Sequence, residues 1–298
     1  MQRRSGLLFA LVIVACVLFA VSIQAEVSSD KLKPPEPGMV QRLTLNDGST
    51  LIGKITAVGD EDVTFQSSMG EVTIKKENIK RIEEVPESSF KKGKYWYPNP
   101  NQTRLLIGPT ARTLPPGKGY LFDIMIFFPG AAIGVTKNFM ISGGASIFPG
   151  ADDQLLYFIP KIGVSINDQL DVAGSVVILY LLDEAAFLGM GTMTFGEPDY
   201  SLTAGLALAW TDEELQDEPA WTLGGEYRFA RRLSLVAEGW YIPGDNGAKM
   251  FMPAIRFFGE QMTLDFGMGF GSDNKDENDP LDTDDVSWIP YIDFVWNF

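Results

Sequence analysis

The sequence contains no histidine, and this absence bears directly on catalysis. Histidine titrates near neutrality and is the most common general acid or base in proteins. Active sites built on a His base are therefore excluded. A Ser-Lys or carboxylate-only site stays compatible with the composition, but no motif points to one, so we expect no enzyme activity and no catalytic residue.

Cysteine is almost absent as well, since Cys16 is the only one in the chain. A fold held together by disulfides is excluded. A structural zinc site is disfavoured too, because it needs a cluster of Cys or His ligands. We therefore expect neither a metal site nor a cofactor.

Long apolar runs are confined to the first 25 residues. Arg3 and Arg4 precede an apolar run over residues 7–23, and Gln24-Ala25 separates this run from Glu26. This layout is typical of a secretory signal peptide that is cleaved after Ala25. The alternatives are a single transmembrane helix, for which the run is short, and lipidation of Cys16, past which the run continues.

Residues 26–38 are polar and rich in proline, which indicates a linker. Residues 39–85 then alternate short apolar strands with hairpin turns such as Asn46-Asp47-Gly48 and Met69-Gly70. The segments "LNDGSTLIGKITAVGDEDVTF" and "GEVTIKKENIKRIEE" resemble small Sm-like or SH3-like barrels. The resemblance implies a small β module, which a signal peptide would place in the periplasm.

This module carries a short basic run, which consists of Lys75, Lys76, Lys80 and Arg81. Depending on the cellular compartment, Sm-like modules bind RNA, bind peptides, or bind no ligand. With a signal peptide ahead of the module, we expect a solvated basic edge and no nucleic-acid partner. A second linker follows over residues 86–102.

The remainder, residues 103–298, predicts an antiparallel transmembrane β-barrel, so that the fold class is all-β. In residues 200–210, Tyr200, Leu202 and Leu206 share one face, and Ser201 and Thr203 share the other. This period of two indicates a strand, and its length suits a tilted crossing of a bilayer. Twelve such segments are expected, at 119–128, 130–136, 139–148, 155–166, 170–181, 185–195, 200–210, 220–229, 233–242, 250–258, 261–271 and 287–298. An even number is what a closed bacterial barrel needs.

The ends of these segments support the barrel. Aromatic residues gather in two bands, as in the girdles of outer-membrane barrels. One band, beside the short turns, contains Phe139, Phe195, Tyr200, Tyr227, Phe229 and Phe257; the other contains Tyr180, Trp210, Trp221, Tyr241, Phe251 and Phe270. The connections also alternate between short and long, which predicts short turns in the periplasm and long loops outside.

The sequence is compatible with more than one position for the first strand of the barrel. The segment 104–109 is compatible with a further strand, a periplasmic strap, or a piece folded into the barrel mouth. If 104–110 is the first strand, residues 119–136 form one long bulged strand, and the total is still twelve.

Four hairpin segments carry a resemblance to porin-like outer-membrane barrels over residues 103–298. They are "GVTKNFMISGG", "PKIGVSINDQLDVAGSV", "GGEYRFARRLSLVAEGW" and "RFFGEQMTLDFG". The final strand, which contains Phe294, Trp296 and Phe298, resembles the assembly signal of outer-membrane proteins. The resemblance implies an integral outer-membrane protein, with membrane lipid and the barrel-assembly machinery as partners.

The alternation places charged side chains on the inward face. These lumen-lining residues are Asp123, Lys161, Asp171, Glu226, Arg228, Glu238, Arg256, Asp265 and Asp293. Arg256 and Asp265 are expected to be diagonal neighbours across a turn. The charges either pair off and fill the interior or form a polar lining that selects solutes. Six acids against three bases favour cations.

Two long connections are acidic. They contain Asp212, Glu213, Glu214, Asp217 and Glu218, and Asp273, Asp276, Glu277, Asp279, Asp282, Asp284 and Asp285. Solvated loops are the preferred interpretation. Divalent cations that bridge these loops to anionic lipid headgroups are the alternative, although the Gly and terminal Glu of an EF-hand are missing.

Together, these features predict an outer-membrane barrel for the passive passage or binding of small solutes, with a preference for cations. The alternative is a structural or docking protein, in which the barrel merely anchors the periplasmic module.

Overall fold

The computed structural model describes residues 32–298 except 92–93, 152, 183, 212–217, 245–246 and 274–286. The predicted signal peptide and most of the first linker therefore lie outside the described residues. The chain divides into two compact units, Met1–Trp96 and Tyr97–Phe298. None of the helices in the described ranges has the length and apolar character of a membrane-spanning helix.

The first unit contains a five-stranded antiparallel sheet in the order β4-β3-β2-β1-β5. Its strands are β1 (Met39–Leu45), β2 (Thr50–Val58), β3 (Asp62–Ser67), β4 (Gly70–Lys75) and β5 (Ile79–Pro86), followed by the short pair β6 (Phe90–Lys91) and β7 (Lys94–Tyr95). The alternating apolar residues of these strands meet in one core, which includes Leu43, Ile55, Val63, Phe65 and Ile82. A small β module is present where one is predicted, and its identification as Sm-like stays a prediction.

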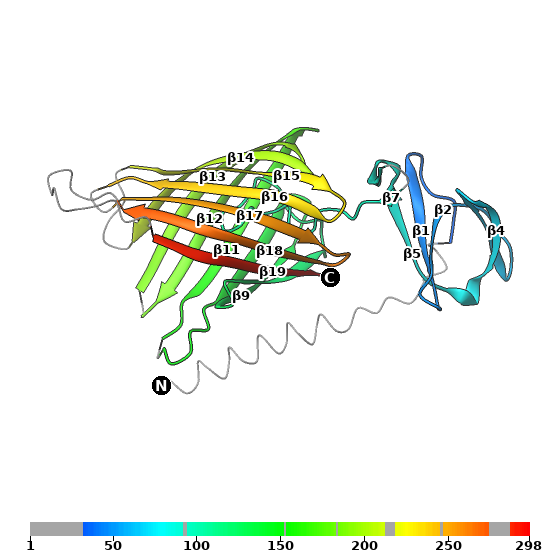
Figure 1. Cartoon of the computed structure of the whole chain (residues 1–298), viewed down its shortest axis with the longest axis horizontal. Helices are drawn as coiled ribbons and strands as arrows, with labels where there is room; N and C mark the ends of the chain where they lie inside the picture. Colours follow the sequence, from blue (N-terminus) through cyan, green and yellow to red (C-terminus); the bar gives the residue numbers. More distant parts are fainter. Residues whose placement is uncertain are drawn as a thin grey trace. The chain divides into compact units, whose positions relative to one another are not determined.

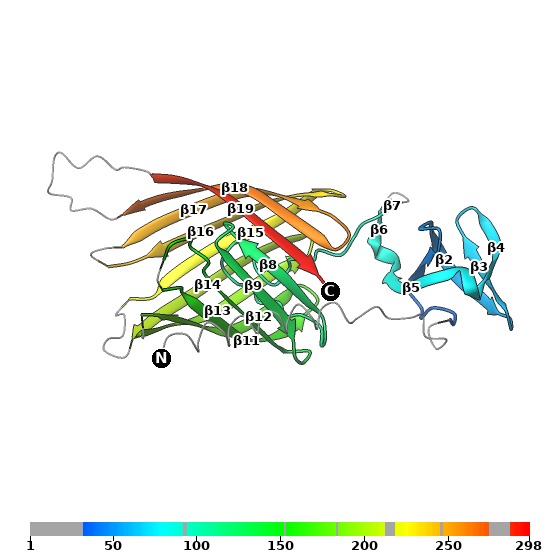
Figure 2. The same ribbon diagram turned by 90° about the horizontal axis from the view of Figure 1, so that it is seen from below.

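The second unit is a closed antiparallel barrel of twelve strands, β8 to β19 (Figures 1 and 2). The strands are β8 (Gly119–Ile124), β9 (Phe128–Gly134), β10 (Phe139–Ala145), β11 (Leu156–Asn167), β12 (Leu170–Leu181), β13 (Glu184–Glu197), β14 (Tyr200–Thr211), β15 (Ala220–Ala230), β16 (Leu233–Ile242), β17 (Ala248–Phe258), β18 (Met262–Asp273) and β19 (Ser287–Asn297). The all-β fold and the twelve-stranded barrel are confirmed. The first strand is β8, and residues 119–136 contain two strands instead of one bulged strand.

The strands turn their apolar side chains outward, as the alternation predicts. On β14, Leu202 and Leu206 are 56% and 59% exposed, whereas Thr203 between them is 1% exposed. Large apolar residues on an outer surface are costly in water, and a closed sheet that carries such a belt suits a bilayer. The wall therefore has the polarity of a membrane barrel.

The barrel closes between its first and last strands. β19 pairs with β8 from Asp293 opposite Ile124 to Asn297 opposite Tyr120, and the two strands lie side by side in Figure 2. The amide of Phe298 donates to the carbonyl of Gly119 over 2.9 Å. A side chain at Gly119 would meet the ring of Phe298, because a Cβ there would lie 2.6 Å from it. Close approach at this seam thus depends on glycine.

Three consecutive strands are shorter than the others. β8, β9 and β10 have 6, 7 and 7 residues, whereas β11 to β15 have at least 11. The turn between β8 and β9 contains Met125 and Ile126 at φ 59° and 68°. This left-handed region is unfavourable for a β-branched residue such as Ile126. The barrel wall is therefore shorter at β8 to β10, and the β8–β9 turn at its long-loop end, which we call the rim, has a strained backbone.

Candidate functional site

The interior of the barrel holds a segment of its own chain, residues 97–118, which we call the plug. Arg228 on β15 donates to the Tyr97 carbonyl over 2.7 Å, and the amide of Gly117 donates to the Gly134 carbonyl over 2.9 Å. Both contacts lie at the end of the barrel with the short turns. The plug thus enters and leaves at this short-turn end. Of the three alternatives for residues 104–109, the structure shows the piece folded inside.

The tip of the plug is a small hairpin. Arg104 and Pro109 form an isolated antiparallel bridge, and the amide of Leu105 donates to the Gly108 carbonyl over 2.9 Å. A hairpin this short leaves several amides without partners in its own strands, and a buried amide needs an acceptor. The partners must come from the barrel wall.

Glu238 on β16 supplies the acceptor for the tip. Its carboxylate accepts from the amides of Leu106, Ile107 and Gly108 over 2.8, 3.0 and 2.8 Å. The indole N–H of Trp240 donates to the same carboxylate. Glu238 is fully buried, and hydrogen bonds from several N–H groups stabilise a buried carboxylate without a cation. A single wall residue therefore fixes the turn of the plug.

Arg256 on β17 is the centre of a buried charge network. It donates to Asp265 on β18 over 2.7 Å and to Glu226 on β15 over 2.8 Å. The same guanidinium donates to the Leu105 carbonyl over 2.7 Å, and Asn99 of the plug donates to Glu226 over 2.8 Å. The network thus joins three strands to the plug. Such a network is favourable only when every charge in it has a partner.

Two further arginines come from the plug itself. Arg104 donates to Asp293 on β19 over 2.5 Å, and Arg112 donates to Asp171 on β12 over 3.2 Å. Burial alone would lower the pKa of Arg104, but the adjacent Asp293 carboxylate outweighs this and raises the pKa. For Arg112, burial lowers the pKa, and Asp171 offsets only part of that effect. Both guanidiniums remain cations at any physiological pH.

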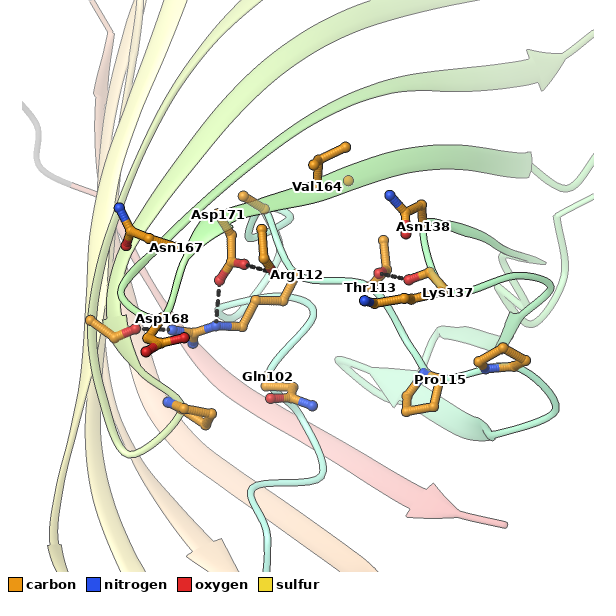
Figure 3. A pocket seen from close by; sticks show the side chains of 16 residues that line it. Gln102, Arg112, Thr113, Pro115, Lys137, Asn138, Val164, Asn167, Asp168 and Asp171 are labelled. Atoms are coloured by element: carbon orange, nitrogen blue, oxygen red, sulfur yellow. Dashed lines mark hydrogen bonds and ion pairs between the residues drawn. The ribbon is translucent and has the colours of Figure 1, made fainter.

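A polar chamber lies at the short-turn end, between the plug and the wall. Its volume is about 620 Å³, and its lining includes Gln102, Arg112, Lys137, Asp168 and Asp171. Figure 3 shows the Arg112 side chain extended toward Asp171 at one side of this chamber. Charged and amide groups line the space, so it suits water and small polar solutes.

A second chamber lies beyond the tip, toward the end with the long loops. Its volume is about 380 Å³, and most of its lining is apolar. The lining includes Phe122, Ile124, Met140, Tyr157, Ile159, Val177, Leu179, Leu188, Met190 and Trp240, together with Lys161. We call it the apolar chamber. The plug therefore separates two spaces of opposite chemistry.

Eight of the nine predicted lumen residues face the interior. Seven are buried: Lys161, Glu226, Arg228, Glu238, Arg256, Asp265 and Asp293. The eighth, Asp171, pairs with Arg112 of the plug. Asp123 is the exception, because it is in register with Phe294 on the outer face, whereas Tyr120 and Phe122 take the inward positions. Arg256 and Asp265 are direct partners in register and not diagonal neighbours.

The plug residues Asn99, Arg104 and Arg112 belong to the site but are not among the residues predicted from the strand alternation. Their signal was weak but present, since Arg104 and Arg112 are the only charged residues in the stretch 97–117. An arginine inside an apolar stretch of a barrel protein needs a buried carboxylate. The inward acids of the strands were the available partners.

Other predicted sites fall elsewhere. The acidic loops lie mostly outside the described residues, so cation binding there stays a prediction. Within the described ranges, no group of His, Cys, Asp or Glu has the arrangement of a metal site. Trp296 and Phe298, of the predicted assembly signal, are exposed at the outer surface.

No protein-family model matches the chain, and no curated protein matches it either. Among solved structures, the KdgM porin is similar at 8% identity and a TM-score of 0.46, covering 61% of this chain and 99% of its own. OmpT of Vibrio cholerae is similar at 12% identity and a TM-score of 0.35, and the match covers 88% of this chain and 95% of OmpT. Pseudomonas aeruginosa OprD is similar at 8% identity and a TM-score of 0.36, and the match covers 92% of this chain and 98% of OprD.

The barrel fold itself is established by the strand pairing, which closes β8 to β19 into one sheet. The likeness says nothing of the solute, and the functional argument rests on the geometry of the plug and the two chambers.

Proposed function

We propose that the chain is an integral outer-membrane β-barrel protein with a central passage for small solutes, closed by its own residues 97–118. The apolar outer belt supports the membrane placement, because residues such as Leu206 and Trp221 stay exposed on the closed wall. No enzymatic role is proposed.

The observation that carries this proposal is the plug between two chambers. A barrel that served only as an anchor needs no internal space, and its lumen could be filled by side chains of the strands. Here a loop of the chain, joined to the wall by hydrogen bonds and ion pairs, occupies the middle. Spaces of about 620 and 380 Å³ remain on its two sides. Such an arrangement suits a passage that opens when the loop moves.

The charge of the lumen bears on the predicted cation preference. With Asp123 on the outer face, the inward strand residues comprise five acids, Asp171, Glu226, Glu238, Asp265 and Asp293, and three bases, Lys161, Arg228 and Arg256. Arg104 and Arg112 of the plug bring the bases to five. The closed lumen is thus balanced, and we propose that the preference for cations appears only when the plug is displaced.

Conductance in planar bilayers tests the proposal. The unmodified protein should give little steady current. A variant in which residues 102–110 are replaced by a Gly-Ser loop of equal length should conduct and should favour cations. The control is Asp60→Asn, which changes an exposed turn residue of the N-terminal unit and leaves the plug and both chambers unchanged.

Folding of both variants is checked by their faster migration on detergent gels before boiling. Silence from a folded, plug-free barrel would contradict the channel and favour the alternative, a barrel that anchors the N-terminal module. Anion-selective current would contradict the charge argument. The anchor alternative is supported by the buried ion network in the middle of the lumen, because such a network occupies the space that a passage would need.

The placement of the module and the assembly signal are also proposals. We propose that the small β module lies in the periplasm and that the barrel-assembly machinery binds the last strand. Phe298→Ala should lower the amount of assembled barrel in outer membranes more than Phe229→Ala does, since Phe298 lies at the closing seam. Both are exposed aromatic residues. Equal amounts, or recovery in a soluble fraction, would count against these assignments.

A further inference from the structure

The apolar chamber contains a cation that has no carboxylate partner. Among the described residues, Arg104, Arg112, Arg228 and Arg256 each form an ion pair, whereas none is found for Lys161. Lys161 is 4% exposed. Its ammonium donates to the carbonyls of Thr103 and Thr110 over 2.8 and 3.1 Å. An ammonium has three N–H donors, so one remains for a ligand.

The space beside this ammonium is shaped for hydrocarbon. Leu179, Leu188, Met190 and Ile159 line the chamber from β11, β12 and β13. The chamber has a volume of about 380 Å³, within the usual range for sites that hold small molecules. A mostly apolar cavity with one polar anchor orients an amphiphile, because the chain avoids water and the head finds the charge.

The chamber lies behind the low part of the wall. Its lining includes Ile124, Met125 and Phe128 at the top of β8 and β9. β19 pairs with β8 only from Asp293 onward, apart from one bond between the Met125 amide and the Ile292 carbonyl. Within the part of the chain that is described, no strand pairs with the upper edge of β19, residues 287–291, on that side.

This edge is apolar as well as unpaired on that side. Trp288 on this edge is 65% exposed, and Ile126, on the strained turn between β8 and β9, is 60% exposed. An unpaired edge at membrane depth is costly unless it borders a cavity or an occupant.

We propose that the apolar chamber binds a single-chain amphiphile with a carboxylate head, of the fatty-acid class, whose carboxylate pairs with Lys161. Its hydrocarbon chain lies along Leu179 and Leu188, and the molecule enters sideways from the membrane between the upper edge of β19 and the turn of β8 and β9. The proposal rests on the outer-membrane placement given above, but it needs no conductance.

Tryptophan fluorescence tests the binding. The full-length protein in neutral detergent is titrated with a brominated fatty acid, which quenches indoles that it contacts. Saturable quenching is expected, because Trp240 lines the chamber. This saturable part should vanish in Trp240→Phe and persist in Trp221→Phe, whose residue is exposed on the outer face. Quenching that only rises in proportion to the added fatty acid would overturn the site.

The head group is tested on the unmodified protein as well as on variants. The fatty acid should bind at least tenfold more tightly than the alcohol of equal chain length. Lys161→Met should remove this difference, whereas Lys249→Met, at an exposed position on β17, should keep it. If Lys161→Met does not fold, Lys161→Arg retains the charge and should retain the preference. Equal affinities for acid and alcohol in the unmodified protein would overturn the role of Lys161.

The sideways entrance has its own test. Ile126→Asn suits the left-handed backbone and makes the rim polar. In liposomes this change should slow the approach to saturation at least threefold while the final affinity is unchanged. An unchanged rate would place the entrance at the long-loop end. Failure of the channel proposal leaves all three measurements interpretable, since none of them measures current.

Discussion

The two halves of the lumen solve the problem of an enclosed interior differently. Toward the short turns, the wall presents charges such as Glu226, Arg256 and Asp265, and the plug supplies the donors and acceptors that they need. Toward the long loops, the wall presents mostly apolar side chains, and they line a chamber that the plug tip borders at Ile107 and Gly108. In the polar half, the plug satisfies the buried charges and leaves a polar chamber of about 620 Å³ beside it, whereas the apolar half holds a chamber of about 380 Å³ beyond the plug tip.

The difference follows from the cost of each kind of surface. A buried charge without a partner costs several kcal/mol, so the charged half requires a filling that provides partners at fixed positions. An apolar cavity costs much less folding free energy, because the side chains that line it lose only van der Waals contacts. The plug therefore stops at Glu238, where the charged half of the wall ends. The predictions below compare the two halves by changing one side chain at a time.

The largest effect is expected at the centre of the charged half. Arg256→Ala leaves Asp265 and Glu226 buried without their cation, which should cost about 3–5 kcal/mol of unfolding free energy. Urea unfolding of the barrel in lipid measures this. Lys54→Ala, which removes an exposed ion pair with Glu87 in the N-terminal unit, should cost that unit about 1 kcal/mol or less, measured by urea unfolding of the same unit. Similar costs would mean that the network adds no stability beyond that of a surface pair.

A smaller effect is expected where the charged half ends. Glu238→Gln keeps the shape of the side chain but replaces one acceptor oxygen by a donor, which opposes the amides of Leu106 and Gly108. The cost should be about 1–3 kcal/mol. Hydrogen exchange at residues 106–108 should accelerate, while that of β14 stays unchanged. Unchanged exchange at the tip would show that Glu238 does not hold the plug.

The smallest effect is expected in the apolar half. Leu179→Ala enlarges a cavity that already exists, and it should cost less than about 2 kcal/mol. Leu106→Ala is the same substitution in the plug itself, where the side chain is fully buried in a packed cluster. Its cost should reach the range of about 2–5 kcal/mol known for packed cores. Equal losses of unfolding free energy in the two variants would contradict an open apolar chamber.

Much of the barrel could be predicted because each strand carries its own signal. The alternation in residues 233–242 placed Glu238 inward, and that in 261–271 placed Asp265 inward, without knowledge of any other strand. Strand β16 then follows the predicted bounds, from Leu233 to Ile242. Local periodicity is sufficient for such residues because the membrane outside and the polar lumen inside impose the same rule on each strand.

The rule failed at Asp123 for a physical reason. Strand β8 borders the apolar chamber, so its inward residues Tyr120 and Phe122 are as apolar as its outward ones. A polar residue in such a strand no longer marks the lumen side. The error thus coincides with the part of the lumen that departs from an ordinary polar interior.

The plug could not be predicted because its conformation depends on distant partners. Residues 97–118 have no apolar period, and the hairpin tip is held by a glutamate 130 residues further along the chain. The strand register places that glutamate only after the barrel has closed. Sequence alone left three alternatives, and only the tertiary contacts distinguish between them.

The seam between Gly119 and Phe298 has a consequence for the order of assembly. Closure joins the first and last strands, so it is the contact of longest sequence separation and is expected to form late. Residues 97–118 precede β8 and are tied at both ends to the short-turn side. They must be in place when the seam forms, and the nascent wall therefore folds around its own plug as around a template.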